Sequence, residues 1–168
     1  MKRRCDFGRY WVRRPVWFVV ALLLIIPAPA TTQVAISLET LRDMKFGEIA
    51  ASIDGGGTVV VSPDSDSVTI SGELTGFGGT VRRARIRITG EPRAYVIVTL
   101  PSSITIRRGT SSNYMTINNF TMDVTNPVRL NNSGKKTINI GATLHVGTDQ
   151  KSGNYNDENS FTYFVEYL

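Results

Sequence analysis

Residues 84–89 read ARIRIT and residues 95–100 read YVIVTL, and these two neighbouring stretches decide the fold class. In the first stretch, Ala84, Ile86 and Ile88 alternate with polar residues, so they share one face of a β-strand. The second stretch is apolar at nearly every position, and we expect it to be a central strand covered on both faces. Together the two stretches predict a β-sheet protein with an aliphatic core.

Similar short, β-branched stretches recur along the chain, separated by clusters of turn-forming residues such as Asp54-Gly55-Gly56-Gly57. Helical spacing of apolar residues is hard to find. The sequence therefore predicts an all-β fold, an immunoglobulin-like two-sheet sandwich, with a small β-barrel as the alternative. The expected strands cover residues 58–61, 68–71, 84–89, 95–100, 104–107, 114–122, 137–146 and 161–168.

The first 30 residues have the layout of an export signal. A basic start precedes the uncharged residues 16–26 (VWFVVALLLII), and Ala28-Pro29-Ala30 then places small side chains before a cleavage point. The uncharged stretch is shorter than the roughly 20 residues that a bilayer-spanning helix needs. We expect a signal peptide over residues 1–30 that is cleaved before Thr31, with a retained membrane anchor as the alternative.

Loss of this leader changes the charge of the chain. The full sequence carries 19 Lys and Arg and 14 Asp and Glu, and residues 1–30 hold six of the basic residues and one acidic residue. Thirteen of each sign remain, so the folded part is neutral and no nucleic-acid partner is expected. The one cysteine, Cys5, also lies in the leader, and we expect a mature domain without disulfides.

Both ends of the expected mature chain alternate between apolar and polar residues. An N-terminal extension at residues 31–43 precedes a sandwich domain at residues 44–168. The apolar face of the first end consists of Val34, Ile36 and Leu38, and that of the last end consists of Phe161, Tyr163, Val165 and Tyr167. A strand with an unpaired edge can bind a strand from another molecule. Either both ends pair within one molecule, or the first is a donor strand and the last borders an acceptor site.

Three arginines lie on the polar face of the stretch 84–89 or directly before it. Arg83, Arg85 and Arg87 project together, opposite the aliphatic side chains of this strand. They predict either a basic face for an anionic glycan or lipid headgroup, or a solvated face that prevents wrong strand pairing. We favour the solvated face, because the mature chain is neutral and no aromatic residue lies between the arginines.

Few residues point to catalysis. His145 is the only histidine, and its phase opposes Leu144 and Val146, so we expect it to point outward. The segment Asp64-Ser65-Asp66 reads as a turn, because it lacks the further acidic ligands and the glycine of a calcium loop. No nucleophile elbow or zinc motif is present in the sequence. We expect no catalytic site, no metal and no cofactor, and a hydrolase is the least favoured function.

Six short segments of the chain form an ordered set. They are residues 44–49 (MKFGEI), 89–92 (TGEP), 100–106 (LPSSITI), 115–120 (MTINNF), 140–146 (IGATLHV) and 153–155 (GNY). In their order and spacing, these segments resemble the bacterial family called domain of unknown function 4402 (DUF4402). The resemblance covers residues 44–167, and no single segment would suffice for it. The chain departs from the family pattern at residues 157–159, a slightly longer loop, and at Leu168, which follows Tyr167.

Proteins of that family resemble the secreted subunits of bacterial fimbriae that are assembled by a chaperone and an usher. Such subunits are immunoglobulin-like sandwiches that lack a final strand, and the amino-terminal extension of a neighbour fills the gap. They carry a penultimate tyrosine in the last strand, which Tyr167 matches. The resemblance supplies no catalytic residue.

The resemblance implies a non-enzymatic surface protein: a fimbrial or pilus-type structural subunit, or an adhesin, that assembles by strand addition. The implied partners are copies of the chain or related subunits, with a periplasmic chaperone and an outer-membrane usher during export. The chain would pass through the periplasm to the cell surface or the exterior, and contact the membrane only through its signal peptide. The alternative is a monomeric periplasmic or secreted binding module, for example for a glycan.

Overall fold

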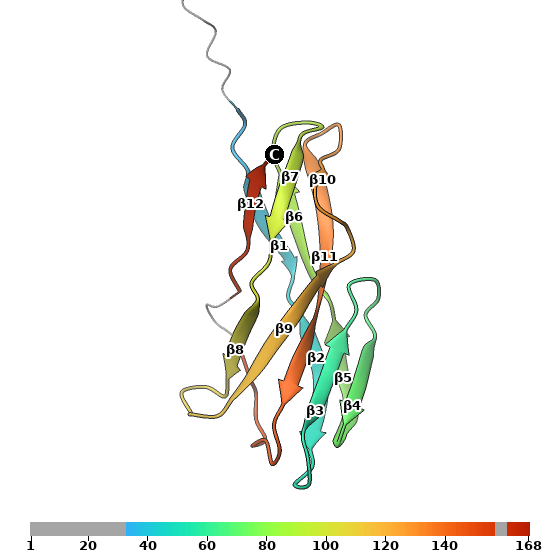
Figure 1. Cartoon of the computed structure of the whole chain (residues 1–168), viewed down its shortest axis with the longest axis vertical. Coiled ribbons are helices and arrows are strands. Elements are labelled where there is room, and N and C mark those ends of the chain that lie inside the picture. The colour runs from blue at the N-terminus through green and yellow to red at the C-terminus, as the bar shows by residue number, and fades with distance from the viewer. Residues whose placement is uncertain (1–32, 157–160) are drawn as a thin grey trace, which may run out of the picture. The chain divides into compact units, whose positions relative to one another are not determined.

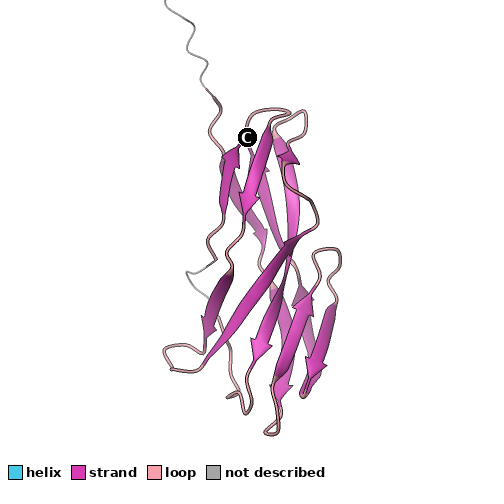
Figure 2. Ribbon diagram, in the orientation of Figure 1, coloured by secondary structure: helices cyan, strands magenta, loops and turns pink. Residues whose placement is uncertain are grey.

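The computed structural model describes residues 33–156 and 161–168, and every helix or strand assigned within them is a β-strand (Figures 1 and 2). The prediction of an all-β, sandwich-like fold is confirmed. The predicted leader and its cleavage point before Thr31 lie outside the described residues, as does the departure from the family pattern at residues 157–159. In the part of the chain that the structure describes, no helix is long and apolar enough to cross a membrane.

The strands form three antiparallel sheets. The large sheet consists of β1 (Ser37–Arg42), β3 (Gly57–Val61), β4 (Val68–Gly72), β6 (Ala84–Thr89), β8 (Ser103–Arg107), β9 (Tyr114–Met122) and β11 (Lys135–Val146). The second sheet consists of β7 (Tyr95–Thr99), β10 (Val128–Arg129) and β12 (Phe164–Tyr167), and the third of β2 (Lys45–Ala51) and β5 (Leu74–Arg82).

Strand β11 is the central strand of the large sheet, because three other strands pair with it. Its residues up to Ile140 pair with β6 and those from Ala142 pair with β3, while β9 pairs along its other edge. Gly141 lies where β11 passes from one partner to the next. A Cβ atom at Gly141 would collide with the carbonyl oxygen of Val61, so only glycine fits at this change of partner.

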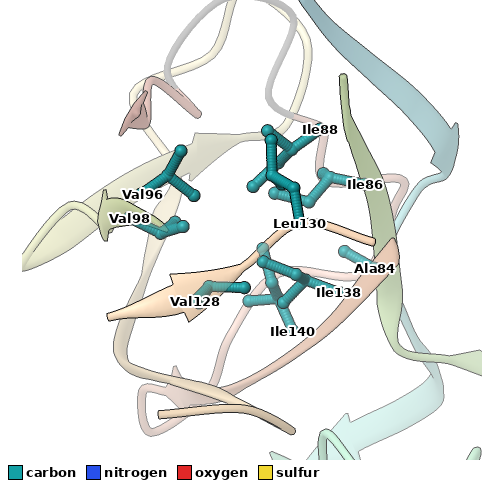
Figure 3. Packing of buried hydrophobic residues seen from close by; sticks show 9 residues of the cluster. All are labelled: Ala84, Ile86, Ile88, Val96, Val98, Val128, Leu130, Ile138 and Ile140. Atoms are coloured by element: carbon teal, nitrogen blue, oxygen red, sulfur yellow. The ribbon is translucent and has the colours of Figure 1, made fainter. Parts of the chain in front are cut away.

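The first core cluster lies between the three-stranded sheet and strands β6 and β11 (Figure 3). It contains Ala84, Ile86, Ile88, Val96, Val98, Val128, Leu130, Ile138 and Ile140. The alternation in β6 produces this cluster, because its three aliphatic side chains are buried and the residues between them are not. Each large aliphatic side chain that is fully buried stabilises the fold by roughly 1.5–3 kcal/mol.

The second core cluster lies around the other half of β11. It contains Val59, Ile106, Ile117, Ala142, Leu144 and Val146, which come from β3, β8, β9 and β11. Half-buried side chains of the third sheet, among them Phe46, Ile49 and Leu74, pack against it. The two clusters therefore share β11, and the small third sheet covers the second cluster.

Strand β7 is the central strand of its sheet, as expected, but its outer face is covered only at Ile97, and in part, so the prediction that residues 95–100 are covered on both faces was wrong. Val96 and Val98 are buried, but Tyr95 is 46% exposed. The guanidinium of Arg129 lies 5.8 Å from the centre of the Tyr95 ring. A cation over the ring face lets an aromatic side chain remain at the surface, which an apolar sequence pattern does not predict.

Candidate functional site

The candidate site is the seam along one side of the sandwich where the first and last described strands lie beside one another (Figure 1). Among the described strands, β1 pairs only with β6 and β12 pairs only with β7. We call this place the β1–β12 seam. Its apolar residues are Val34, Ile36 and Leu38 on the first side and Phe161, Tyr163, Val165 and Tyr167 on the second. The two apolar faces expected from the ends of the sequence are therefore brought together within one chain.

Strand β1 lies at an edge of the large sheet, and none of its side chains is fully buried. Leu38 lies opposite Ile88, and Thr40 lies opposite Ile86. Residues opposite one another in an antiparallel pair share a face, so Leu38 is on the core side of β1, yet it is 41% exposed. Ile36 is half-buried and packs against the first core cluster. The segment thus covers the core only lightly.

Two polar contacts fix the ends of the segment Val34–Arg42. At the first end, the hydroxyl of Tyr167 donates to the carbonyl oxygen of Val34 at 2.6 Å, which we call the Tyr167 clip. At the other end, the guanidinium of Arg42 donates to both carboxylate oxygens of Asp66 at 2.9 and 2.8 Å, which we call the Asp66 clip. The backbone amide of Arg83 also donates to Asp66, at 3.1 Å. The Arg83 amide and the Arg42 guanidinium lower the pKa of the Asp66 carboxyl from its usual 3.8.

The Tyr167 hydroxyl joins three separate segments. Besides donating to Val34, it accepts a hydrogen bond from the backbone amide of Glu91 at 2.7 Å. Gly90 makes this approach possible, because a Cβ atom there would lie 2.5 Å from the Tyr167 hydroxyl oxygen. The glycine of the TGEP turn and the penultimate tyrosine therefore form one structural unit.

The free edge of β12 faces away from β7. The amide of Leu168 donates to the carbonyl oxygen of Tyr95 at 3.0 Å. Because hydrogen-bonded and non-hydrogen-bonded pairs alternate along antiparallel strands, the N–H and C=O groups of Val165 and Tyr167 point away from β7. No other described strand pairs with β12. Its outward backbone groups can therefore accept an added strand.

The opposite edge of the three-stranded sheet is closed by a side chain. The Asn126 side chain accepts from the amide of Val98 at 3.0 Å and donates to the carbonyl oxygen of the same residue at 2.8 Å. Asn126 thus takes the place of a strand where the two-residue β10 ends. This contrast marks the β12 edge as the open one of the two, and nothing in the local sequence pattern pointed to Asn126.

The predicted basic face lies on the outward side of β6, and each arginine there has a partner. Arg83 donates to the carbonyl oxygen of Pro63 at 3.0 Å and Arg85 donates to the side-chain oxygen of Asn139 at 2.9 Å, while Arg87 pairs with Glu39 at 3.1 Å. The Arg87–Glu39 pair joins β6 to β1. Arg85 and Arg87 therefore connect β6 to β11 and β1, and Arg83 connects the start of β6 to the turn after β3.

The remaining polar candidates lie apart from the seam. His145 is exposed, and its Nε2 lies 2.8 Å from the side-chain oxygen of Asn118. In the turn at residues 64–66, the carboxylate of Asp66 forms an ion pair with the guanidinium of Arg42. Within residues 33–156 and 161–168, no group of three or more His, Cys, Asp or Glu side chains could hold a metal ion. A depression of about 640 Å³ lies beside the turn that contains Asn131 and Ser133.

A family model described as a domain of unknown function, DUF4402, matches residues 36–167. The match runs from the residue before β1 to the last residue of β12, and it includes every apolar residue of the seam except Val34. The comparisons with curated proteins and with solved structures gave no match.

Proposed function

The chain belongs to the DUF4402 family, and we propose that it is a non-enzymatic, exported structural subunit or adhesin of a fimbria-like fibre that assembles by strand addition. The proposed donor is the N-terminal segment that carries Val34, Ile36 and Leu38. The proposed acceptor is bordered by Phe161, Tyr163, Val165 and Tyr167 of a neighbouring copy or a related subunit. A periplasmic chaperone and an outer-membrane usher would handle the chain during export to the cell surface.

The observation that carries the proposal is the position of β1 at an edge of the large sheet, where none of its side chains is fully buried. Strand β1 pairs with one neighbour, and the hydroxyl of Tyr167 reaches the carbonyl oxygen of Val34 in the segment that leads into it. An edge strand of this kind is the element that copies of a protein exchange at low cost. The apolar residues on both sides of the seam supply side-chain contacts for an incoming strand, and its backbone supplies hydrogen bonds.

A disulfide that ties β1 to its own sheet tests this proposal. Glu39 and Arg87 are opposite residues of β1 and β6, and their side chains meet on the outer face. The variant Glu39→Cys/Arg87→Cys, made with Cys5→Ser so that no other thiol is present, joins the two strands when it is oxidised. We expect the oxidised exported protein to remain monomeric at concentrations where the reduced protein and the wild type assemble.

A matched control uses a strand pair on another edge of the large sheet. Val60 and Thr69 are opposite, exposed residues of β3 and β4. The variant Val60→Cys/Thr69→Cys, also with Cys5→Ser, is expected to assemble whether oxidised or reduced. A wild type that stays monomeric at every concentration, or an oxidised Glu39→Cys/Arg87→Cys protein that assembles normally, would contradict the proposal.

One surface favours the alternative of a monomeric binding module. On the outer face of the three-stranded sheet, Phe164 is 68% exposed, Leu168 is 76% exposed and Tyr95 is 46% exposed. Large apolar side chains that gather at the surface mark binding sites. Glycan binding by a protein that remains monomeric, lost in Tyr95→Ala or Phe164→Ala, would support this alternative.

A further inference from the structure

We infer that the exchanged strand is β1 and that its acceptor in the second copy is the edge of β6, where it takes the place of that copy's own β1. This inference rests on the proposed function, because it names the binding place of the donor segment. The free edge of β12 is the competing place. The contacts of the segment Val34–Arg42 decide between the two edges.

The groups that hold this segment form a complete receptor outside the segment itself. Ile86 and Ile88 lie opposite Thr40 and Leu38 in the register of the β1–β6 pair. The receptor also has one polar group for each end of the segment and one for its middle. These are the Tyr167 hydroxyl for Val34, the Arg87 guanidinium for Glu39 and the Asp66 carboxylate for Arg42. All of them follow β1 in the sequence, so a copy whose own β1 has left retains the whole receptor.

The connection after β1 allows the strand to move while the rest of the chain stays in place. Two residues, Asp43 and Met44, separate β1 from β2. Strand β2 belongs to a different sheet, where it pairs with β5. A change of backbone direction at Asp43, which is exposed, therefore releases β1 from β6 and leaves the β2–β5 pair intact.

Transfer of β1 to the β6 edge of a second copy conserves the contacts of the single chain. The pairs of β1 with β6, the ion pair with Arg87 and both clips form again in the same geometry. The remaining costs are the rearrangement at the hinge and the loss of freedom on association, as in other exchanges of identical elements.

Addition of β1 to the free edge of β12 does not conserve these contacts. The donor copy loses all five Cα pairs between β1 and β6, and its receptor is left empty. The new pairs with β12 involve backbone groups of two residues, Val165 and Tyr167. Arg42 also loses both hydrogen bonds to Asp66. The β6 edge is therefore the preferred acceptor.

Mixtures of single-cysteine variants of the exported protein, all with Cys5→Ser, distinguish the two edges. Glu39→Cys reports on β1, Arg87→Cys on β6 and Glu166→Cys on the outer face of β12. The control partner is Lys151→Cys, an exposed residue outside the seam. Glu39→Cys is mixed in turn with each of the other three variants, in a thiol–disulfide buffer and at concentrations where the wild type assembles. The products are analysed on non-reducing gels.

We expect the mixture of Glu39→Cys with Arg87→Cys to give at least about tenfold more disulfide-linked heterodimer than the mixtures of Glu39→Cys with Glu166→Cys or with Lys151→Cys. The reason is that strand pairing raises the effective thiol concentration toward the millimolar range. The mixture of Ser37→Cys with Thr89→Cys repeats the measurement at a second pair of the same register. This second mixture tests the exchange on β6 even where Glu39→Cys or Arg87→Cys folds poorly.

The outcomes separate this inference from the proposed function. Cross-links at Glu166 in place of those at Arg87 would overturn the exchange on β6 while strand addition stands. If assembly occurs without cross-links at either edge, and the intrachain disulfide between positions 39 and 87 does not prevent it, both are wrong. Heterodimer at Arg87, together with loss of assembly in the oxidised double variant, supports both.

Discussion

The hydroxyl oxygen of Tyr167 lies 2.6 Å from the carbonyl oxygen of Val34, so the last described strand holds the segment that leads into the first. The same oxygen accepts a hydrogen bond from the amide of Glu91. A single side chain thus fixes the start of the domain, the turn before β7 and the end of β12. This relationship makes the two ends of the domain dependent on one another.

Removal of this hydroxyl should destabilise the domain without changing its fold. Tyr167→Phe keeps the ring against the first core cluster and deletes both hydrogen bonds. We expect the free energy of unfolding to fall by about 1–2 kcal/mol, because each net hydrogen bond contributes roughly 0.5–1.5 kcal/mol. Denaturant titration measures the change. The control is Tyr114→Phe on a side chain that is 59% exposed, and an equal loss in both variants would argue against the Tyr167 clip.

Alanine at Gly134 should lower the stability of the domain more than alanine at Gly109, because two unfavourable effects combine at Gly134. Gly134 has a φ of +70°, where side chains are strained, and a Cβ atom there would collide with the carbonyl oxygen of Gly90. Gly109 has a φ of +53° but has open space around it. We expect Gly109→Ala to cost about 1 kcal/mol from strain and Gly134→Ala about 2–3 kcal/mol or more. Equal costs in thermal denaturation would mean that the turn relaxes around the new methyl group.

The Asp66 clip should make stability depend on pH in the acidic range. The pKa of Asp66 is lowered in the folded chain from its usual 3.8, so the ionised form favours folding. This contribution is complete above pH 3.8 and is lost as the pH falls through the lowered value. We expect the stability of the wild type to fall more steeply below pH 4 than that of Asp66→Asn. Asp64→Asn, in the same loop, should follow the wild type.

The parts of the fold that follow from local alternation could be predicted from the sequence. Residues 84–89 and 114–122 form strands with the expected bounds. Residues 84–89 alternate strictly, whereas the alternation in residues 114–122 changes phase at Asn118 and Asn119, where the pairing with β11 is irregular. The expected strands 137–146 and 161–168 correspond to Lys135–Val146 and Phe164–Tyr167. Strand β5 was missed, because its sequence LTGFGGTVR contains three glycines and its pairing with β2 includes irregular steps.

The seam could be predicted only in part, for a different physical reason. The apolar faces of the two ends are local patterns, and the sequence revealed them. The polar groups that fix the N-terminal segment come from distant positions: Asp66 lies 24 residues from Arg42, and Tyr167 lies 133 residues from Val34. Such pairs depend on the register of strands that are far apart in the chain, which one sequence does not encode in any local motif.

Ile36 connects stability and assembly most directly. In the single chain its half-buried side chain packs against the first core cluster, and an exchanged β1 would place it against the same cluster of another copy. A carboxylate at this position is poorly solvated in both states. We therefore expect Ile36→Asp to weaken the hold of β1 and to abolish assembly.

The remainder of the core does not depend on Ile36, so the Ile36→Asp monomer should stay folded. We expect it to lose roughly 1–3 kcal/mol, the contribution of a partly buried aliphatic side chain. Thermal melts and size-exclusion chromatography separate the two effects, and Val60→Asp, on an exposed side chain of β3 that is remote from the seam, is the control. An Ile36→Asp protein that assembles like the wild type would remove the N-terminal segment from the assembly mechanism. Complete unfolding of Ile36→Asp would instead mean that β1 is an integral strand of the monomer, which would favour the monomeric binding module.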